Sequence, residues 1–263
     1  MKMTFRWYGD NDPVTLGQIR QIPGVTGIVS AIYNIPVGKV WPVEAIRELK
    51  EKVSRSGLAL EVIESVPVHE DIKLRRGKYQ EYIENYKENI RRLAAEGIRC
   101  ICYNFMPVFD WTRSRLDQPL PDGSNALVYY KEDVDRMDPA KMSLPGWDAS
   151  YFPEEIEELI REYQLQGIEG LWENLKYFIQ EIIPVAIECN VNMGLHPDDP
   201  PWPISEFPEL SRTRLPLTVS FRFMMIPTMA SAFAAAAWAA PPATISRIWC
   251  ANTERWEEYI LPI

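Results

Sequence analysis

The order of secondary structure in this chain is clearest in residues 79–105, which read YQEYIENYKENIRRLAAEGIRCICYNF. Apolar side chains recur there at spacings of three and four residues up to Ala94, with charged residues between them, as on an amphipathic helix. Gly97 then stands where a glycine helix cap belongs, and an apolar run from Ile98 to Phe105 follows. This stretch predicts a helix that leads directly into a buried strand.

The same alternation of strand and helix recurs through the first 196 residues. Apolar runs that end near Tyr8, Tyr33, Ser65, Phe105 and His196 predict five strands, with helices between them. Continuous apolar runs are typical of parallel strands joined by right-handed crossovers, so the fold class is α/β. Two architectures fit: a doubly wound open sheet, or an incomplete TIM-like (β/α)8 barrel with about five βα units. No glycine-rich nucleotide motif follows a predicted strand, which favours the barrel.

Composition limits the partners and the compartment that we expect. The chain has 263 residues and a formal net charge of -9, so a basic face for nucleic-acid phosphates is not expected. The amino-terminal residues lack the apolar core of a signal peptide, which predicts a cytoplasmic protein with reduced thiols. Cys100 and Cys102 alternate on one face of a predicted strand, and we interpret both as small core residues.

A polar loop follows the last predicted strand. Residues 191–203 read VNMGLHPDDPPWP, an apolar strand that stops at His196 in an acidic, proline-rich segment. An imidazole beside Asp198 and Asp199 offers donors for a divalent metal ion or an acid/base site. The alternative is a histidine packed at a strand end beside a solvated turn.

Several long motifs resemble those of the mannonate dehydratase family. They are MTFRWYG at 3–9, QIPGVTGIV at 21–29, EVIES at 61–65, CYNFMPVFDWTR at 102–113 and GLHPDDPPWP at 194–203. The resemblance covers residues 1–204 and implies a TIM-like barrel related in architecture to the xylose isomerases. It also implies a lyase, a hydro-lyase that converts D-mannonate to 2-keto-3-deoxy-D-gluconate in hexuronate (glucuronate) breakdown, with Mn²⁺ or Fe²⁺ as cofactor.

The resemblance implies roles at the metal site and for the partners. His196 is then a metal ligand, and Asp198 and Asp199 either orient it or only shape the loop. The family's further ligands, a cysteine followed by a later histidine and aspartate, are not found in this chain. The implied partner is the sugar acid D-mannonate, and neither nucleic acid nor membrane is implied. The resemblance leaves open whether the intact family members form homo-oligomers.

Other residues of these motifs are candidates for contact with the substrate. Arg6, Asn104 and Arg113 carry cationic and amide groups that pair with carboxylate and hydroxyl oxygens, although the two arginines could instead form salt bridges at the barrel mouth. Trp7 is a candidate wall of the pocket. His69 is a candidate contact, or alternatively a solvent-facing loop residue. The general base and general acid are not assigned.

Residues 205–263 depart from this pattern. The stretch 223–246 has no charged residue and contains four consecutive alanines at 234–237. We interpret this Ala/Pro-rich tail as a frame-shifted reading of the rest of a barrel; a transmembrane segment and a natural divergent ending are the alternatives. In the shifted frame, the positions of Met225 and Ile226 must both read as Asp, and those of Ala230 and Ala239 must read as Gly. The coding DNA sequence decides whether the frame shift is present.

A chain truncated in this way is expected to be inactive. A non-catalytic fragment, a membrane-associated scaffold or a related TIM-barrel sugar isomerase are the alternative functions.

Overall fold

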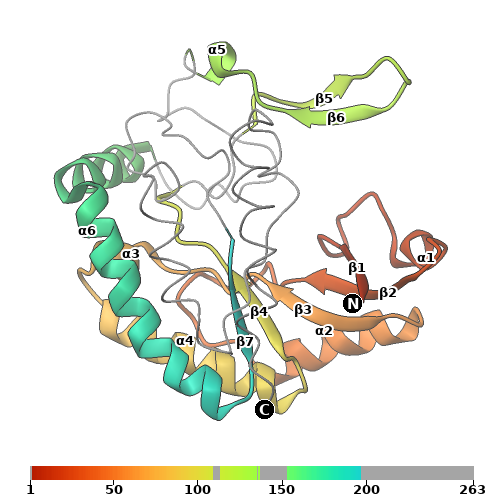
Figure 1. Cartoon of the computed structure of the whole chain (residues 1–263), viewed down its shortest axis with the longest axis horizontal. Coiled ribbons are helices and arrows are strands. Elements are labelled where there is room, and N and C mark those ends of the chain that lie inside the picture. The colour runs from red at the N-terminus through yellow and green to blue at the C-terminus, as the bar shows by residue number, and fades with distance from the viewer. Residues whose placement is uncertain (1, 109–112, 135, 137–152, 197–263) are drawn as a thin grey trace, which may run out of the picture.

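A computed structural model describes residues 2–108, 113–134, 136 and 153–196 (Figure 1). Five strands form one parallel sheet in the spatial order β1 (Met3–Arg6), β2 (Val25–Ser30), β3 (Ala59–Glu64), β4 (Cys100–Tyr103), β7 (Asn192–Leu195). Strands therefore follow one another across the sheet in chain order. A doubly wound sheet reverses its strand order part-way, so this order confirms the predicted arc of a barrel.

Three long helices lie along one side of this sheet (Figure 1). They are α2 (Val43–Arg55), α4 (Tyr79–Ala95) and α6 (Pro153–Glu188), and each precedes a strand of the sheet as a crossover connection should. In α2 the apolar positions Ile46 and Val53 are fully buried, while charged residues occupy the outer face. Gly57, at φ +74°, then allows the turn into β3 that other residues would adopt at a cost.

Helix α6 consists of two helical stretches that meet at Gly167. This glycine has φ 66° and ψ -178°, a combination that only glycine adopts without strain. The sequence predicted two helices here, around 154–163 and 171–189, and the break at Gly167 lies between them. The second stretch carries the side chains that cover the sheet.

The core lies between the sheet and these helices, and Phe178 of α6 is at its centre. Its ring contacts Tyr86 of α4 at a centroid distance of 5.1 Å, and Tyr103 and Phe105 at 5.7 Å each. Phe178 and its partner Tyr103 are fully buried. A single aromatic side chain thus joins α4, α6 and the end of β4.

The structure adds elements between β4 and α6 that the sequence did not predict. A two-stranded antiparallel hairpin, β5 (Arg115–Pro119) and β6 (Asn125–Val128), extends away from the sheet and is followed by α5 (Lys131–Val134) (Figure 1). Gly123, at φ +84°, follows Asp122 in its turn, and this Asp-Gly pair is a recognised hairpin signal. The hairpin was missed because its strands are polar and lack an apolar face. Helix α3 (Glu70–Leu74) was also missed, because it has only five residues.

Residues 205–263 lie outside the described residues. The interpretations of this tail as a frame-shifted segment, a transmembrane segment or a divergent ending therefore stay predictions. Within the described ranges, every helix is too short or too polar to cross a bilayer.

Replacing Phe178 with alanine is expected to lower the free energy of unfolding by about 3–5 kcal/mol, because it opens a cavity among three aromatic rings. Leu165→Ala is the matched control in the same helix: Leu165 is 82% exposed, and its loss should cost under about 0.5 kcal/mol. Urea unfolding followed by circular dichroism measures both. Equal effects of the two substitutions would contradict this account of the core.

Candidate functional site

Strand alternation separates the polar strand-end residues from the core. Ile63, Ile101 and Tyr103 are fully buried on the helix side of the sheet. The residues next to them in sequence, Glu64 and Cys102, therefore point to the opposite face, which we call the inner face. Glu64 and Cys102 are also paired in the register of β3 and β4.

The buried thiol of Cys102 on the inner face is not suited to bind metal. A hydrogen bond with Cys100, followed by burial, raises the pKa of Cys102 far above its usual value. The charges of Glu64 and Arg6 act on the same thiol, which places both of them near it. Cys102 is therefore a protonated, buried group at neutral pH, in agreement with its interpretation as a core residue.

An ion pair joins the ends of β1 and β3 on the inner face. Arg6 Nη1 lies 2.9 Å from Glu64 Oε2, so the guanidinium spans the end of β2. Its Nη2 donates to the hydroxyl of Tyr33 at 3.3 Å, and the guanidinium carbon lies 5.0 Å from the centre of the Tyr8 ring. Nε of Arg6 is buried and has no hydrogen-bond partner among the described residues. The predicted salt bridge is thus present for Arg6, and its guanidinium has five N–H donors, more than these contacts use.

Asn104 and His196 follow neighbouring strands at the same edge of the sheet. Cys102 pairs with Gly194 and Tyr103 with Leu195, and the backbone N–H of His196 donates to the carbonyl of Tyr103 at 2.7 Å. Asn104 Oδ1 accepts a hydrogen bond from the backbone N–H of Met106 at 3.4 Å. Its Nδ2 donates to no group in the described part of the chain. The amide therefore presents a donor beside the Arg6–Glu64 pair and His196.

Residues 1–216 match the family model described as D-mannonate dehydratase (UxuA). The chain belongs to the mannonate dehydratase family. It is 55% identical over 214 residues to mannonate dehydratase of Streptococcus pneumoniae (strain 70585), covering 80% of this chain and 58% of that protein. It is 56% identical over 212 residues to the Streptococcus uberis protein, covering 80% and 61%.

A solved structure of the family agrees with this assignment. The crystal structure of mannonate dehydratase from Streptococcus suis serotype 2 matches with a TM-score of 0.74 and 48% sequence identity, over 86% of this chain and 60% of that chain. The chain thus spans about three-fifths of the length of the family members it matches. The resemblance inferred from the motifs is therefore confirmed, as is the α/β barrel class.

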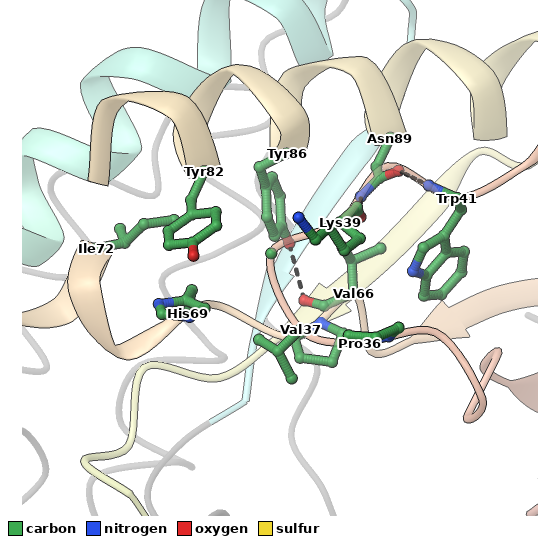
Figure 2. Close-up of a pocket in the computed structure, with 12 residues that line it drawn as sticks. Pro36, Val37, Lys39, Trp41, Val66, His69, Ile72, Tyr82, Tyr86 and Asn89 are labelled. Atoms are coloured by element: carbon green, nitrogen blue, oxygen red, sulfur yellow. Dashed lines mark hydrogen bonds between the residues drawn. The ribbon is translucent and has the colours of Figure 1, made fainter. Parts of the chain in front are cut away.

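His69, predicted to contact substrate in this family member, has a structural role. Its Nδ1 accepts a hydrogen bond from the backbone N–H of Asp71 at 3.0 Å, so it caps α3. Its ring stacks on Tyr82 of α4 with centroids 3.9 Å apart, as Figure 2 shows. Burial lowers the pKa of His69 below its usual value, which keeps the ring neutral and able to accept. His69 thus has a structural role at the start of α3, and its contact with substrate stays a prediction.

A small hollow adjoins His69, but it is separate from the inner face. It lies between α4 and the loops after β2 and β3, and its walls include Val37, Trp41, Val66 and Tyr86 (Figure 2). These walls are mostly apolar, and Arg6, Glu64, Asn104 and His196 do not line it. The polar strand ends, rather than this hollow, form the candidate functional site.

Other predicted site residues lie elsewhere. Trp7 is 4% exposed and packs in the core, where its backbone carbonyl accepts a hydrogen bond from the Ser30 hydroxyl at 2.7 Å. Arg113 lies just before the hairpin rather than at a strand end of the sheet. Asp198 and Asp199 lie outside the described residues. Their roles in substrate binding and metal orientation stay predictions.

Glu64 belongs to the site but is not among the residues that the sequence predicted to contact substrate. It ends the EVIES motif, and a charged residue that closes an apolar strand was a usable signal for it. Only the structure shows that it holds Arg6 across β2, because the two residues are 58 positions apart and meet through the sheet.

The described residues do not by themselves complete a metal site. In the ranges 2–108, 113–134 and 153–196 there is no group of three or more His, Cys, Asp or Glu side chains arranged to hold an ion. His196, at the end of β7, is the predicted ligand that falls within these ranges.

The cap formed by His69 predicts a pH dependence of stability. Because its pKa is lowered on folding, the unfolded chain binds the proton first as pH falls below about 6.5, and the free energy of unfolding decreases. The stabilisation is fully present above that pH. His69→Asn keeps a capping side chain that does not titrate, so its stability should fall less between pH 7.5 and 5.5. Denaturant unfolding at both pH values tests this, and identical losses in the two chains would contradict it.

Proposed function

We propose that this chain carries the sugar-acid-binding part of a mannonate dehydratase, a hydro-lyase that converts D-mannonate to 2-keto-3-deoxy-D-gluconate in glucuronate breakdown. Family membership supports the reaction. The observation that carries the proposal is the convergence of Arg6, Glu64, Asn104 and His196 at one edge of the inner face. In barrel enzymes this carboxyl edge of the strands is where substrates bind.

The reaction explains why these residue types are needed. A base removes the proton at C2, the C3 hydroxyl leaves as water after protonation, and the resulting enol becomes the 2-keto acid. Negative charge develops beside the carboxylate as C2 loses its proton. The guanidinium of Arg6 would pair with that carboxylate, while Asn104 Nδ2 would donate to a sugar hydroxyl. Glu64 would hold the guanidinium in place between turnovers.

We also propose that His196 contributes one ligand to a divalent ion, Mn²⁺ or Fe²⁺. Imidazole is a suitable ligand for both ions, and Asp198 and Asp199 would orient the ring or the loop. Such an ion supplies charge neutralisation at the carboxylate and hydroxyl of the substrate. Because the described residues lack the remaining donors, no step is assigned to the ion.

The proposal extends to location and to the tail. A small sugar acid is the proposed partner, and the proposed location is the cytoplasm. Nucleic acid and membrane are not proposed as partners. Whether intact members of the family form homo-oligomers stays open. Residues 1–204 would form the partial barrel domain. Residues 205–263 would be an aberrant, frame-shifted segment, and the net charge of -9 supports the exclusion of nucleic acid.

Arg6→Gln is expected to weaken D-mannonate binding by roughly ten- to a hundredfold, because charge-assisted hydrogen bonds are worth about 1.5–3 kcal/mol. Calorimetric titration of the full chain with D-mannonate in the presence of Mn²⁺ measures the affinity, and keto-acid formation measures turnover. Arg47→Gln is the matched control, since Arg47 pairs with Glu96 on the outer surface at 2.8 Å. Absence of binding by the unaltered chain, or equal affinities for all three proteins, would refute the proposal.

The chain has two histidines, which allow a paired test of the metal proposal. His196→Ala is expected to reduce Mn²⁺ affinity at least about tenfold, since it removes a direct ligand. His69→Asn should leave it unchanged. Equilibrium dialysis with elemental analysis measures bound Mn²⁺, and equal retention by the two variants would show that His196 is not a ligand.

A further inference from the structure

A charged pair is buried next to the loop that follows β4. Glu70 and Lys73 of α3 are only 5% and 3% exposed, and Lys73 Nζ lies 2.6 Å from Glu70 Oε1. Lys73 Nζ also donates to the backbone carbonyl of Met106 at 2.7 Å. Charged side chains this deeply buried require polar partners, and here one of those partners is the β4 loop itself.

The second carboxylate oxygen of Glu70, Oε2, accepts two hydrogen bonds, one from α6 and one from the β4 loop. It accepts a hydrogen bond from the hydroxyl of Tyr163, in the first stretch of α6, and one from the backbone N–H of Val108 at 3.4 Å. Both carboxylate oxygens are therefore bonded, to Lys73, Tyr163 and Val108. We call Glu70, Lys73 and Tyr163 the buried triad.

Helix α3 is fixed in turn by α6. The side-chain amide of Asn174 donates to the carbonyl of Lys73 at 2.8 Å, and that of Gln166 donates to the same carbonyl at 3.2 Å. Asn174 also donates to Gln166 at 3.0 Å. These bonds lie on both sides of the break at Gly167, so α3 is held by both stretches of α6. The triad thus connects a rigid helix to the β4 loop.

The β4 loop has a conformation that needs such support. Val108 has φ +57°, a left-handed conformation that is unfavourable for a β-branched residue. Strained backbone of this kind persists only when surrounding contacts determine it. Val108 is 2% exposed and its N–H is bonded to Glu70, while the Met106 carbonyl is bonded to Lys73. The triad supplies both polar contacts.

The same loop sets the orientation of Asn104. The Met106 N–H donates to Asn104 Oδ1, and the Met106 carbonyl is held by Lys73. The Met106 N–H needs an acceptor, so Asn104 turns Oδ1 toward it, and Lys73 holds the carbonyl end of the same residue. Nδ2 is then left as the donor.

We propose that Glu70, Lys73 and Tyr163 are positioning residues, which hold the loop after β4 so that Asn104 presents Nδ2 to a sugar acid on the inner face. This inference rests on the proposed function for its ligand, but its structural part is independent. A buried ion pair is weak support for stability, since apolar residues of similar size often serve as well. Fixing one loop conformation gives the pair a role that apolar side chains could not fill.

Tyr163→Phe tests the proposal in the full chain, because it removes one hydroxyl and leaves the ring. Hydrogen exchange followed by mass spectrometry should show at least tenfold faster exchange in the peptide that covers residues 104–108, with little change in peptides of β1 and β2. Affinity for D-mannonate should fall at least tenfold, and the melting temperature should fall by a few degrees because a buried carboxylate loses one hydrogen bond. A purely structural role would change melting without this selectivity.

Tyr86→Phe is the matched control. The Tyr86 hydroxyl is also buried and donates to a backbone carbonyl, that of Val66, at 3.3 Å. Its loss should leave both the 104–108 peptide and D-mannonate affinity unchanged. The charge-neutral double variant Glu70→Gln with Lys73→Met is a second test, and it should accelerate exchange in the same peptide.

The outcomes separate the two proposals. Unchanged exchange at 104–108 in both triad variants would overturn the positioning role, as would faster exchange with unchanged affinity. If the unaltered chain fails to bind D-mannonate, the proposed function fails. The exchange comparison with Tyr86→Phe then still decides whether the triad holds the loop.

Discussion

The burial of one face of the parallel sheet beneath α2, α4 and α6 is the constraint on which the other features of this structure depend. Side chains alternate along a strand, so packing Ile63, Ile101 and Tyr103 against the helices forces Glu64 and Cys102 to the opposite face. Parallel pairing then brings the carboxyl ends of all five strands to one edge. The candidate site is a consequence of this packing rather than of any local motif.

Polar residues near this edge form two groups with different roles. Arg6, Glu64 and Asn104 are partly exposed on the inner face and retain hydrogen-bonding capacity for a ligand. Glu70 and Lys73 are buried, and their polar atoms are engaged with protein groups. The first group suits recognition of an anionic sugar acid, and the second suits the fixing of a loop.

Other polar side chains also hold loops against the helices. The loop after β2 is held on α4 by Asn89, whose side chain accepts from the Trp41 N–H at 2.7 Å and donates to the Lys39 carbonyl at 3.1 Å. Desolvation lowers the pKa of His69, and its ring caps α3 beside this loop. Asn89 and His69, the latter a candidate substrate contact in the sequence, thus both attach loops to the helical layer.

The sequence by itself determined the class of the fold and the family. Helical periodicity between 79 and 94, continuous apolar strands and glycine at Gly57 and Gly97 are local properties, and they predicted the main strands and helices. The long motifs identified the family for the same reason, since they are read from residue order alone. His196 was placed correctly at the end of a strand because the proline that follows it stops the chain there.

Only the tertiary structure decided which polar residues meet. Glu64 reaches Arg6 across β2, and Tyr163 reaches Glu70 from α6, through contacts between residues far apart in sequence. The sequence left the role of His69 open between substrate contact and a solvent-facing loop residue, because capping and stacking depend on a five-residue helix and on Tyr82 of α4. Periodicity reports which face of an element is apolar; it carries no information on which distant partner satisfies a buried polar group, and that is settled by packing.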